Sequence, residues 1–154
     1  MRLIAPTTPR QLDLGLALLR IVAGIVFAAH GGQKLFVYGF AGVTGAFTQM
    51  GIPLPGITGP LVALVEFFGG LALIVGLLTR LAGVGLTITM LGALLMAHLA
   101  GGFFLPTGIE FVLTLGGIAA ALTLTGAGRY SADAILARRD GSTDEHVRPL
   151  RRAA

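Results

Sequence analysis

The run from residue 61 to residue 78 is apolar except for one carboxylate, Glu66. A helix of about 20 apolar residues is long enough to cross the hydrocarbon core of a bilayer. The apolar runs of this sequence lack the alternation of apolar and polar residues that is typical of membrane β-barrel strands. Lipid also cannot form hydrogen bonds with the backbone at the open edge of a sheet. The sequence therefore predicts an all-α integral membrane protein with four spanning helices, at about 12–36, 61–78, 81–100 and 109–124.

The composition also indicates a polytopic membrane protein. Hydrophobic residues make up 55% of the 154 residues and charged residues 12%, and the mean hydropathy is +0.87. In a soluble domain about a quarter of the residues are charged. The net charge of +4 comes from basic residues that flank the apolar runs, without aromatic side chains for base stacking, so we expect no nucleic-acid partner. The chain has no cysteine, so any redox-active group would have to be a bound molecule.

The lysines and arginines predict the orientation in the membrane. Two arginines precede the first run, Arg80 lies between the second and third, and six arginines follow the fourth. Lys34 lies near the outer end of the first run, and residues 101–108 carry neither lysine nor arginine. The positive-inside rule then places both termini in the cytoplasm, where the chain would contact the inner face of the lipid bilayer.

Loop lengths predict the bundle. Only Thr79 and Arg80 separate the second and third runs, which indicates a tight antiparallel hairpin and an up-down four-helix bundle. We divide the chain into a cytoplasmic N-terminal tail at 1–11, a four-helix transmembrane domain at 12–136 and an Arg-rich mobile cytoplasmic tail at 137–154.

Glycines indicate close packing of these helices. They recur seven residues apart within three of the apolar runs, as Gly24 and Gly31, Gly69 and Gly76, and Gly85 and Gly92. Small residues let transmembrane helices approach one another closely. We interpret most of the 24 glycines as packing residues.

The first outer loop, residues 39–60, contains a predicted amphipathic helix at Ala41–Met50. Its Val43, Phe47 and Met50 fall close to one face. Such a helix can lie on the membrane or cap the outer mouth of the bundle.

Glu66 is the centre of the candidate site. A carboxylate within the membrane costs roughly 2.5 to 3.5 kcal/mol on insertion scales, so Glu66 should face the protein interior and have a partner. We expect Lys34 or His30 as its nearest charged contact. The predicted orientation gathers six polar residues in the outer half as a ligand-binding or proton-handling pocket: His30, Gln33, Lys34, Glu66, His98 and Glu110.

Each of these residues also has a structural interpretation. Lys34 can extend to the outer interface, Glu110 suits the positive end of the fourth helix, and histidines near helix ends can be interfacial. Four further residues, Arg20, Arg80, Arg129 and Asp133, are interpreted as structural ion pairs or topology anchors, with Arg20 either extending to the interface or pairing with Asp133. We predict no metal site, because no helix carries a Glu-x-x-His or His-x-x-x-His pair.

Several motifs resemble the DoxX family of small bacterial membrane proteins. They are Leu-Arg-Ile-Val-Ala-Gly-Ile-Val-Phe at 19–27, His-Gly-Gly-Gln-Lys-Leu-Phe at 30–36, Gly-Ile-Pro at 51–53, Glu-Phe-Phe-Gly-Gly at 66–70, Gly-Leu-Leu-Thr-Arg at 76–80 and Gly-Arg-Tyr-Ser at 128–131. The resemblance spans about 14–136 and implies a multi-pass protein of the bacterial cytoplasmic (inner) membrane linked to redox metabolism. Some relatives resemble quinone-reducing thiosulfate dehydrogenase subunits, and others associate with a superoxide dismutase and a sulfurtransferase.

Three functional hypotheses remain open at this stage. The outer pocket binds a quinone or a similar small molecule, with His30 or Glu66 handling a proton. Alternatively, the chain is a non-catalytic membrane anchor or assembly factor that recruits oxidant-defence or sulfur-metabolism partners. In the third, it transports a small solute or a proton, which would need a polar path from Glu66 to Arg20. Enzymatic activity and a homo-oligomeric state are left open.

Overall fold

The computed structural model describes residues 7–139, and within that range every regular element is helical. The elements are α1 (Pro9–Gly32), the π-helical segment η1 (Gln33–Tyr38), α2 (Gly39–Gln49), α3 (Pro55–Val75), α4 (Thr79–Ala93), the π-helical segment η2 (Leu94–His98), the short 3-10 segment η3 (Leu99–Gly101) and α5 (Glu110–Thr125), followed by helical residues 132–139. The all-α fold class is confirmed. Most of the two predicted tails, at 1–6 and 140–154, lies outside the described residues.

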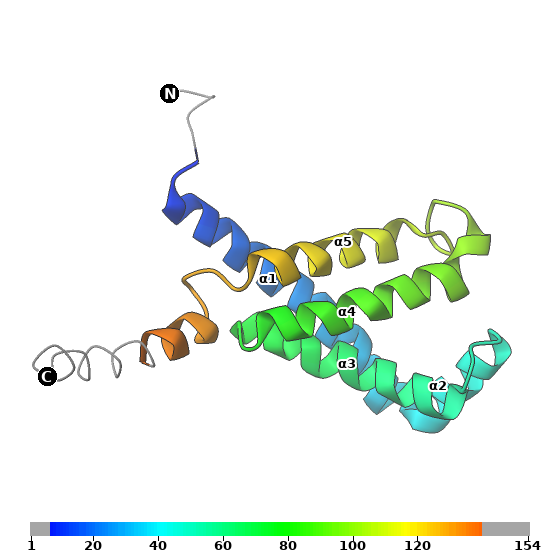
Figure 1. Ribbon diagram of the computed structural model, residues 1–154. Helices are drawn as coiled ribbons and strands as arrows, with labels where there is room; N and C mark the ends of the chain where they lie inside the picture. Colours follow the sequence, from blue (N-terminus) through cyan, green and yellow to red (C-terminus); the bar gives the residue numbers. More distant parts are fainter. Residues whose placement is uncertain (1–6, 140–154) are drawn as a thin grey trace, which may run out of the picture.

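The four longest α-helices run alternately in opposite directions (Figure 1). α1 packs mainly on α3, α4 packs mainly on α5, and α3 joins the two pairs through α4. The start of α1, the α3–α4 turn and the end of α5 lie at one end of the bundle, while α2 lies at the other (Figure 1).

Three helical stretches are long and apolar enough to cross a membrane: Pro9–Gln49, Pro55–Val75 and Thr79–Gly101. The shorter apolar helix α5 has 16 residues. Its length of about 24 Å, at 1.5 Å per residue, is less than the hydrocarbon thickness of about 30 Å. A fourth crossing and the orientation of the bundle therefore remain predictions.

Three helices begin earlier than the hydropathy pattern indicates, and for two of them the local sequence explains the earlier start. α1 starts at Pro9 because Thr8 and Gln11 form a capping box, in which Thr8 Oγ1 accepts from the Gln11 amide and Gln11 Oε1 accepts from the Thr8 amide at 2.9 Å. α3 starts at Pro55, at the first helical position, where a proline loses no internal hydrogen bond. At both helix starts, the local backbone geometry and not the hydropathy determines where the helix begins.

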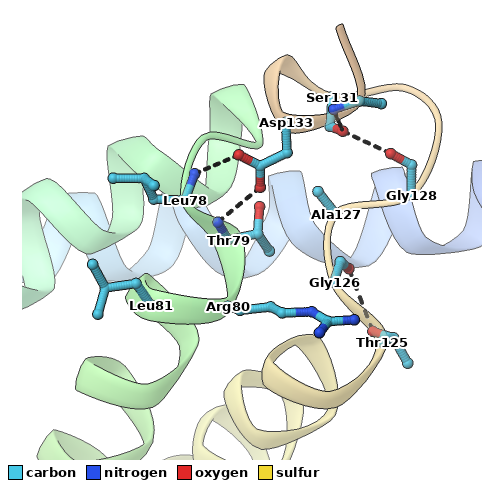
Figure 2. A pocket seen from close by; sticks show the side chains of 11 residues that line it. Leu78, Thr79, Arg80, Leu81, Thr125, Gly126, Ala127, Gly128, Ser131 and Asp133 are labelled. Carbon is cyan, nitrogen blue, oxygen red and sulfur yellow. Dashed lines mark hydrogen bonds between the residues drawn. The ribbon is translucent and has the colours of Figure 1, made fainter. Parts of the chain in front are cut away.

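Asp133 determines where the hairpin between α3 and α4 turns. Its carboxylate accepts hydrogen bonds from the amides of Leu78 (2.7 Å) and Thr79 (3.0 Å) (Figure 2). Its own amide donates to the Gly76 carbonyl (2.9 Å). Gly76 ends α3 with a φ of +74°, in the left-handed region that glycine adopts without strain. The turn is therefore Gly76–Leu78, and the Thr79–Arg80 linker predicted from the sequence belongs to the first turn of α4.

Arg20 of α1 fastens the same end of the bundle. Its side chain is only 1% exposed. Nη1 donates to the carbonyl oxygens of Leu73 and Ile74, and Nη2 donates to that of Tyr130 at 2.7 Å. Carbonyl groups in the last turn of a helix lack hydrogen-bond donors within the helix, and Arg20 supplies such donors at the end of α3. Arg20 therefore does not extend to the interface. It makes no direct ion pair with Asp133, but the two opposite charges lie near enough to attract each other.

The other two predicted anchors lie near this end. Arg80 is exposed and lines an open depression of about 530 Å³ together with Thr125 and Gly126 (Figure 2). The backbone amide of Arg129 donates to the Asp13 carboxylate at 3.1 Å, which ties the segment after α5 to α1. Their role in setting the topology remains a prediction.

Glycines bring the α1 and α3 backbones into contact. A Cβ added to Gly31 would lie 2.2 Å from the Phe67 nitrogen, and one added to Gly70 would lie 2.3 Å from the Ala28 nitrogen. These distances are far below a van der Waals contact, so only glycine fits at either position. The expected packing role therefore applies to Gly31, while Gly76 ends a helix and a Cβ on Gly92 would meet no atom within 4 Å.

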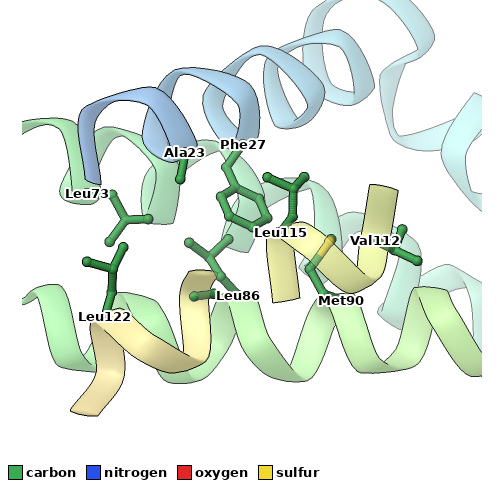
Figure 3. Packing of buried hydrophobic residues seen from close by; sticks show 9 residues of the cluster. Ala23, Phe27, Leu73, Leu86, Met90, Val112, Leu115 and Leu122 are labelled. Atoms are coloured by element: carbon green, nitrogen blue, oxygen red, sulfur yellow. The ribbon is translucent and has the colours of Figure 1, made fainter. Parts of the chain in front are cut away.

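A continuous apolar core fills the space between the helices (Figure 3). It consists of Ala23 and Phe27 from α1, Leu73 from α3, Leu86 and Met90 from α4, and Val112, Leu115, Ala119 and Leu122 from α5. Large apolar side chains also cover the outer surface, such as Leu18 (66% exposed) and Leu124 (79% exposed). Such a surface is suited to contact with lipid.

We predict that Gly31→Ala destabilises the protein by about 1 to 3 kcal/mol, because the added methyl group overpacks the α1–α3 contact. Thermal unfolding in mild detergent measures the effect. Gly15→Ala is the matched control in the same helix, since its Cβ would meet no atom within 4 Å. Equal unfolding temperatures for the two variants would contradict this packing.

We predict that reporter fusions place the two ends of the chain in the cytoplasm and the α2–α3 connection outside it. A reporter after Ala154 should be active only as a cytoplasmic fusion, and one inserted at Ile52 only as an external fusion, because the arginines flank the opposite end of the bundle. The reverse pattern would overturn the orientation.

Candidate functional site

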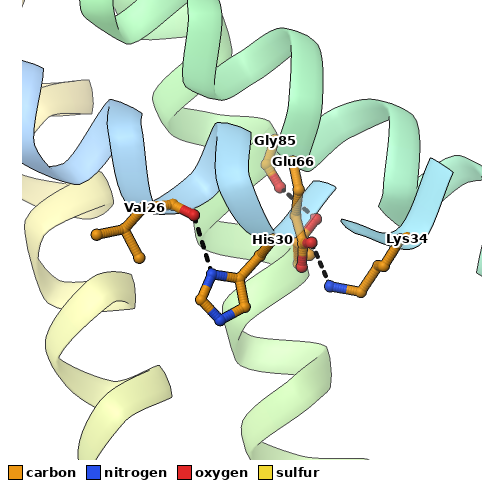
Figure 4. A network of polar contacts seen from close by, with 6 residues as sticks. Val26, His30, Lys34, Glu66 and Gly85 are labelled. Atoms are coloured by element: carbon orange, nitrogen blue, oxygen red, sulfur yellow. Dashed lines mark hydrogen bonds and ion pairs between the residues drawn. The ribbon is translucent and has the colours of Figure 1, made fainter. Parts of the chain in front are cut away.

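Glu66 is buried in the middle of α3 and paired with Lys34 (Figure 4). It is the twelfth of 21 residues in α3, and only 4% of it is exposed. Lys34 Nζ donates to Glu66 Oε2, and the lysine side chain is 23% exposed. Among residues 7–138 this is the one ion pair between side chains.

The local sequence explains how Lys34 reaches this depth. The close contact of Gly31 with Phe67 presses the end of α1 onto α3 one residue after Glu66. The chain then widens into the π-helical segment η1, which carries Lys34. Single π-helical turns inside α-helices are frequent at functional sites, and the second such segment, η2, carries His98.

The two histidines are oriented by backbone carbonyl groups. His30 Nδ1 lies 2.9 Å from the Val26 oxygen (Figure 4). The His30 ring centroid lies 5.4 Å from that of Phe111. His98 Nδ1 lies 3.0 Å from the Ala93 oxygen. Each imidazole is thus fixed through one nitrogen.

These side chains line a single cavity of about 610 Å³ near the middle and α2 end of the bundle. Four of the six residues predicted for the pocket line it: His30, Lys34, Glu66 and His98. Apolar side chains from all five helices form most of the remaining wall, including Phe27, Phe47, Met50, Val65, Met90, Met96, Phe111 and Leu115. Phe47 and Met50 belong to the predicted amphipathic segment and its end, so this segment closes one side of the cavity.

Gln33 and Glu110 do not line this cavity. Gln33 is exposed on η1. Glu110 Oε1 accepts a hydrogen bond from the Leu105 amide at 2.7 Å, which organises the loop before α5. The sequence grouped these two residues with the others by their predicted depth in the membrane, and depth does not determine which side of a helix faces the cavity.

Sequence reasoning missed two polar residues in the wall, Thr58 and Thr89. Both hydroxyl groups donate to backbone carbonyls, Thr58 to Pro53 at 3.0 Å and Thr89 to Gly85 at 3.0 Å. Threonines are common inside transmembrane helices as packing residues, so no sequence signal separated these two from the others. Among residues 7–139, no three histidine, aspartate or glutamate side chains are placed to hold a metal ion.

A family model described as DoxX matches residues 15–99, more than half of the chain. The chain belongs to the DoxX family. A second model, described as the TQO small subunit DoxD, matches residues 58–149. The resemblance seen in the sequence motifs is therefore confirmed.

Curated relatives of this DoxX protein align over most of their length. It is 37% identical over 128 residues to "Inner membrane protein YqjF" of Escherichia coli, covering 80% of the chain and 93% of that protein. It is 34% identical over 152 residues to "Uncharacterized membrane protein Rv3486" of Mycobacterium tuberculosis, with coverages of 88% and 91%. It is 33% identical over 115 residues to "Putative oxidoreductase CatD" of Bacillus subtilis, with coverages of 74% and 82%. No solved structure matches the chain.

These relatives confirm the predicted location. The chain is a multi-pass protein of the inner membrane.

We predict that Lys34→Met destabilises the DoxX protein by about 3 to 5 kcal/mol, because it leaves the buried Glu66 carboxylate without a cation. Glu66→Gln should cost less, since the remaining Lys34 is partly exposed and can extend toward water. The double variant Lys34→Met with Glu66→Gln should regain most of the lost stability. Unfolding in detergent measures all three, and additive losses in the double variant would show that the two charges do not interact.

Proposed function

We propose that this DoxX protein binds a quinone-class molecule in the cavity around Glu66. The observation that carries the proposal is the combination of a largely apolar wall with four titratable side chains, His30, Lys34, Glu66 and His98, in one cavity. Small-molecule sites typically have about 300 to 1,000 Å³, mostly apolar walls and a few oriented polar groups. A cavity of about 610 Å³ fits a substituted aromatic ring and part of its tail.

The mouth of the cavity favours a ligand that arrives from the bilayer. Three of the wall residues, Leu61, Ile88 and Met96, are more than half exposed on the apolar outer surface. A membrane-soluble ring can therefore reach the polar groups without crossing water. Quinones have this property and carry oxygen atoms that can contact polar side chains.

The polar groups suit a molecule whose reactions involve protons. The Lys34 ammonium places a positive charge in the wall, where it can stabilise a developing negative charge on a ligand oxygen. His30 and Glu66 are the candidate proton carriers, and His98 is a further candidate from the neighbouring helix. The name of the CatD relative as an oxidoreductase supports a redox link.

A membrane-subunit role is the second candidate. The match to a small-subunit model over residues 58–149 favours it, because that model is named for one part of a larger enzyme. In this role the chain would recruit redox or sulfur-metabolism proteins to the membrane, and the quinone site would serve the assembly. A subunit role and a quinone site are compatible.

Transport is disfavoured by the apolar core. Side chains between Glu66 and Arg20 on α1 and α3 include the buried Ala23, Phe27 and Leu73 (Figure 3). They occupy the path along which a polar solute would have to move.

We predict that the purified protein retains quinone and that Gly92→Leu lowers quinone affinity by at least roughly tenfold, equal to about 1.4 kcal/mol. Gly92 lines the cavity, and a side chain there would project into open space without disturbing a neighbour. Mass spectrometry of extracted small molecules and a binding titration in detergent provide the two measurements.

Gly117→Leu is the matched control. Gly117 is also surrounded by open space, but it lies on the exposed face of α5 and outside the cavity wall. Equal loss of affinity in both variants, or protein that neither retains nor binds quinone, would contradict the proposed site.

A further inference from the structure

The hydrogen bonds within the cavity wall restrict which form of the ligand it can hold. Six wall residues have polar side chains: His30, Lys34, Thr58, Glu66, Thr89 and His98. Four of these can be uncharged: the two threonines always are, and the two histidines are when one ring nitrogen carries no hydrogen. In each of the four, a side-chain atom is already bonded to a backbone carbonyl oxygen.

The carbonyl contacts fix the histidine tautomers. A carbonyl oxygen can only accept, so Nδ1 must carry the hydrogen in both His30 and His98. In the neutral imidazole the other nitrogen, Nε2, then has no hydrogen and presents a lone pair. In Figure 4 this second nitrogen of His30 points away from the α1 backbone. Each histidine is therefore a hydrogen-bond acceptor toward a ligand.

The threonines are acceptors for the same reason. Thr58 Oγ1 shares its hydrogen between the carbonyl oxygens of Pro53 (3.0 Å) and Leu54 (3.1 Å). Thr89 Oγ1 donates its hydrogen to Gly85. A hydroxyl group has one hydrogen, so only lone pairs remain for a ligand.

The charged pair leaves one donor. An ionised Glu66 only accepts, whereas the Lys34 ammonium has three hydrogens and directs one of them at Glu66. With both histidines neutral, Lys34 is thus the only donor to a ligand among the side chains that line the cavity. The side chains of the wall thus offer several hydrogen-bond acceptors and one donor.

We infer that the cavity selects the reduced, dihydroxy form of its ligand, a hydroquinone, over the oxidised quinone. The inference rests on the proposed function and specifies its ligand. A quinone oxygen can only accept, so it finds Lys34 alone. A hydroquinone hydroxyl group can donate to His30 Nε2, His98 Nε2 or a threonine oxygen, and its oxygen can still accept from Lys34.

Three probes of nearly equal shape test this selectivity: durohydroquinone, duroquinone and the dimethyl ether of durohydroquinone, which has no hydroxyl hydrogen. They are titrated into the full-length protein in detergent, without oxygen and with excess reductant for the hydroquinone. We expect the hydroquinone to bind on the order of 10-fold more tightly than the other two, since it gains one or two net hydrogen bonds.

Variants identify the groups responsible. His30→Phe and His98→Phe should each weaken hydroquinone binding roughly 3- to 10-fold, the loss of one hydrogen bond, and leave the quinone and the ether unchanged. Gln33→Leu is the control, because Gln33 is exposed near His30 but lies outside the wall. Equal effects of the histidine variants on all three probes would overturn the inference.

Nitrogen NMR of the imidazole rings tests the inference in the unaltered protein, so the test does not depend on whether a variant folds. In the unaltered protein at neutral to alkaline pH, His30 and His98 should both show the Nδ1-protonated tautomer, and the Nε2-protonated tautomer in either would overturn the inference. If duroquinone or the ether binds as tightly as the hydroquinone, the selectivity is wrong while the quinone site stands. If none of the three probes binds, the proposed function itself fails.

Discussion

The burial of one carboxylate in the middle of α3 determines much of this structure. Glu66 cannot face lipid without a cost of several kcal/mol, and the chain satisfies it with Lys34 from the end of α1. The α1 and α3 backbones touch beside this pair, which Gly31 and Gly70 permit. Lys34 itself lies in η1, a local departure from α-helical geometry. The same features leave the space around Glu66 open and lined by titratable groups.

Charged side chains have different roles at the two ends of the bundle. At the end with Arg20, the guanidinium and the Asp133 carboxylate bond to backbone groups and hold helix ends together. At the other end, Lys34 and the histidines face a cavity. The apolar core, with Phe27 at its centre (Figure 3), separates these regions. This separation favours a binding site over a continuous path through the protein.

The sequence predicted the helical class, the location and the family, because these depend on long apolar runs and on motifs whose order is specific. It also selected Glu66 and Lys34, since a buried carboxylate needs a cation and few cations are present. Gln33 and Glu110 do not line the cavity, because a shared depth in the membrane does not determine which side chains face the bundle interior. The contacts of Arg20 were not predictable, because they depend on where α3 ends, and Asp133, distant in sequence, fixes that turn.

Photo-crosslinking with an azide-bearing quinone tests the central claim most directly, that Glu66 and Lys34 belong to a ligand cavity. After illumination in membranes, peptide mass spectrometry locates the adducts. The account predicts saturable labelling of peptides around 27–34, 58–66 and 85–98 that unmodified quinone prevents. Labelling without saturation on lipid-facing residues such as Leu18 and Leu124, with none in those peptides, would contradict it.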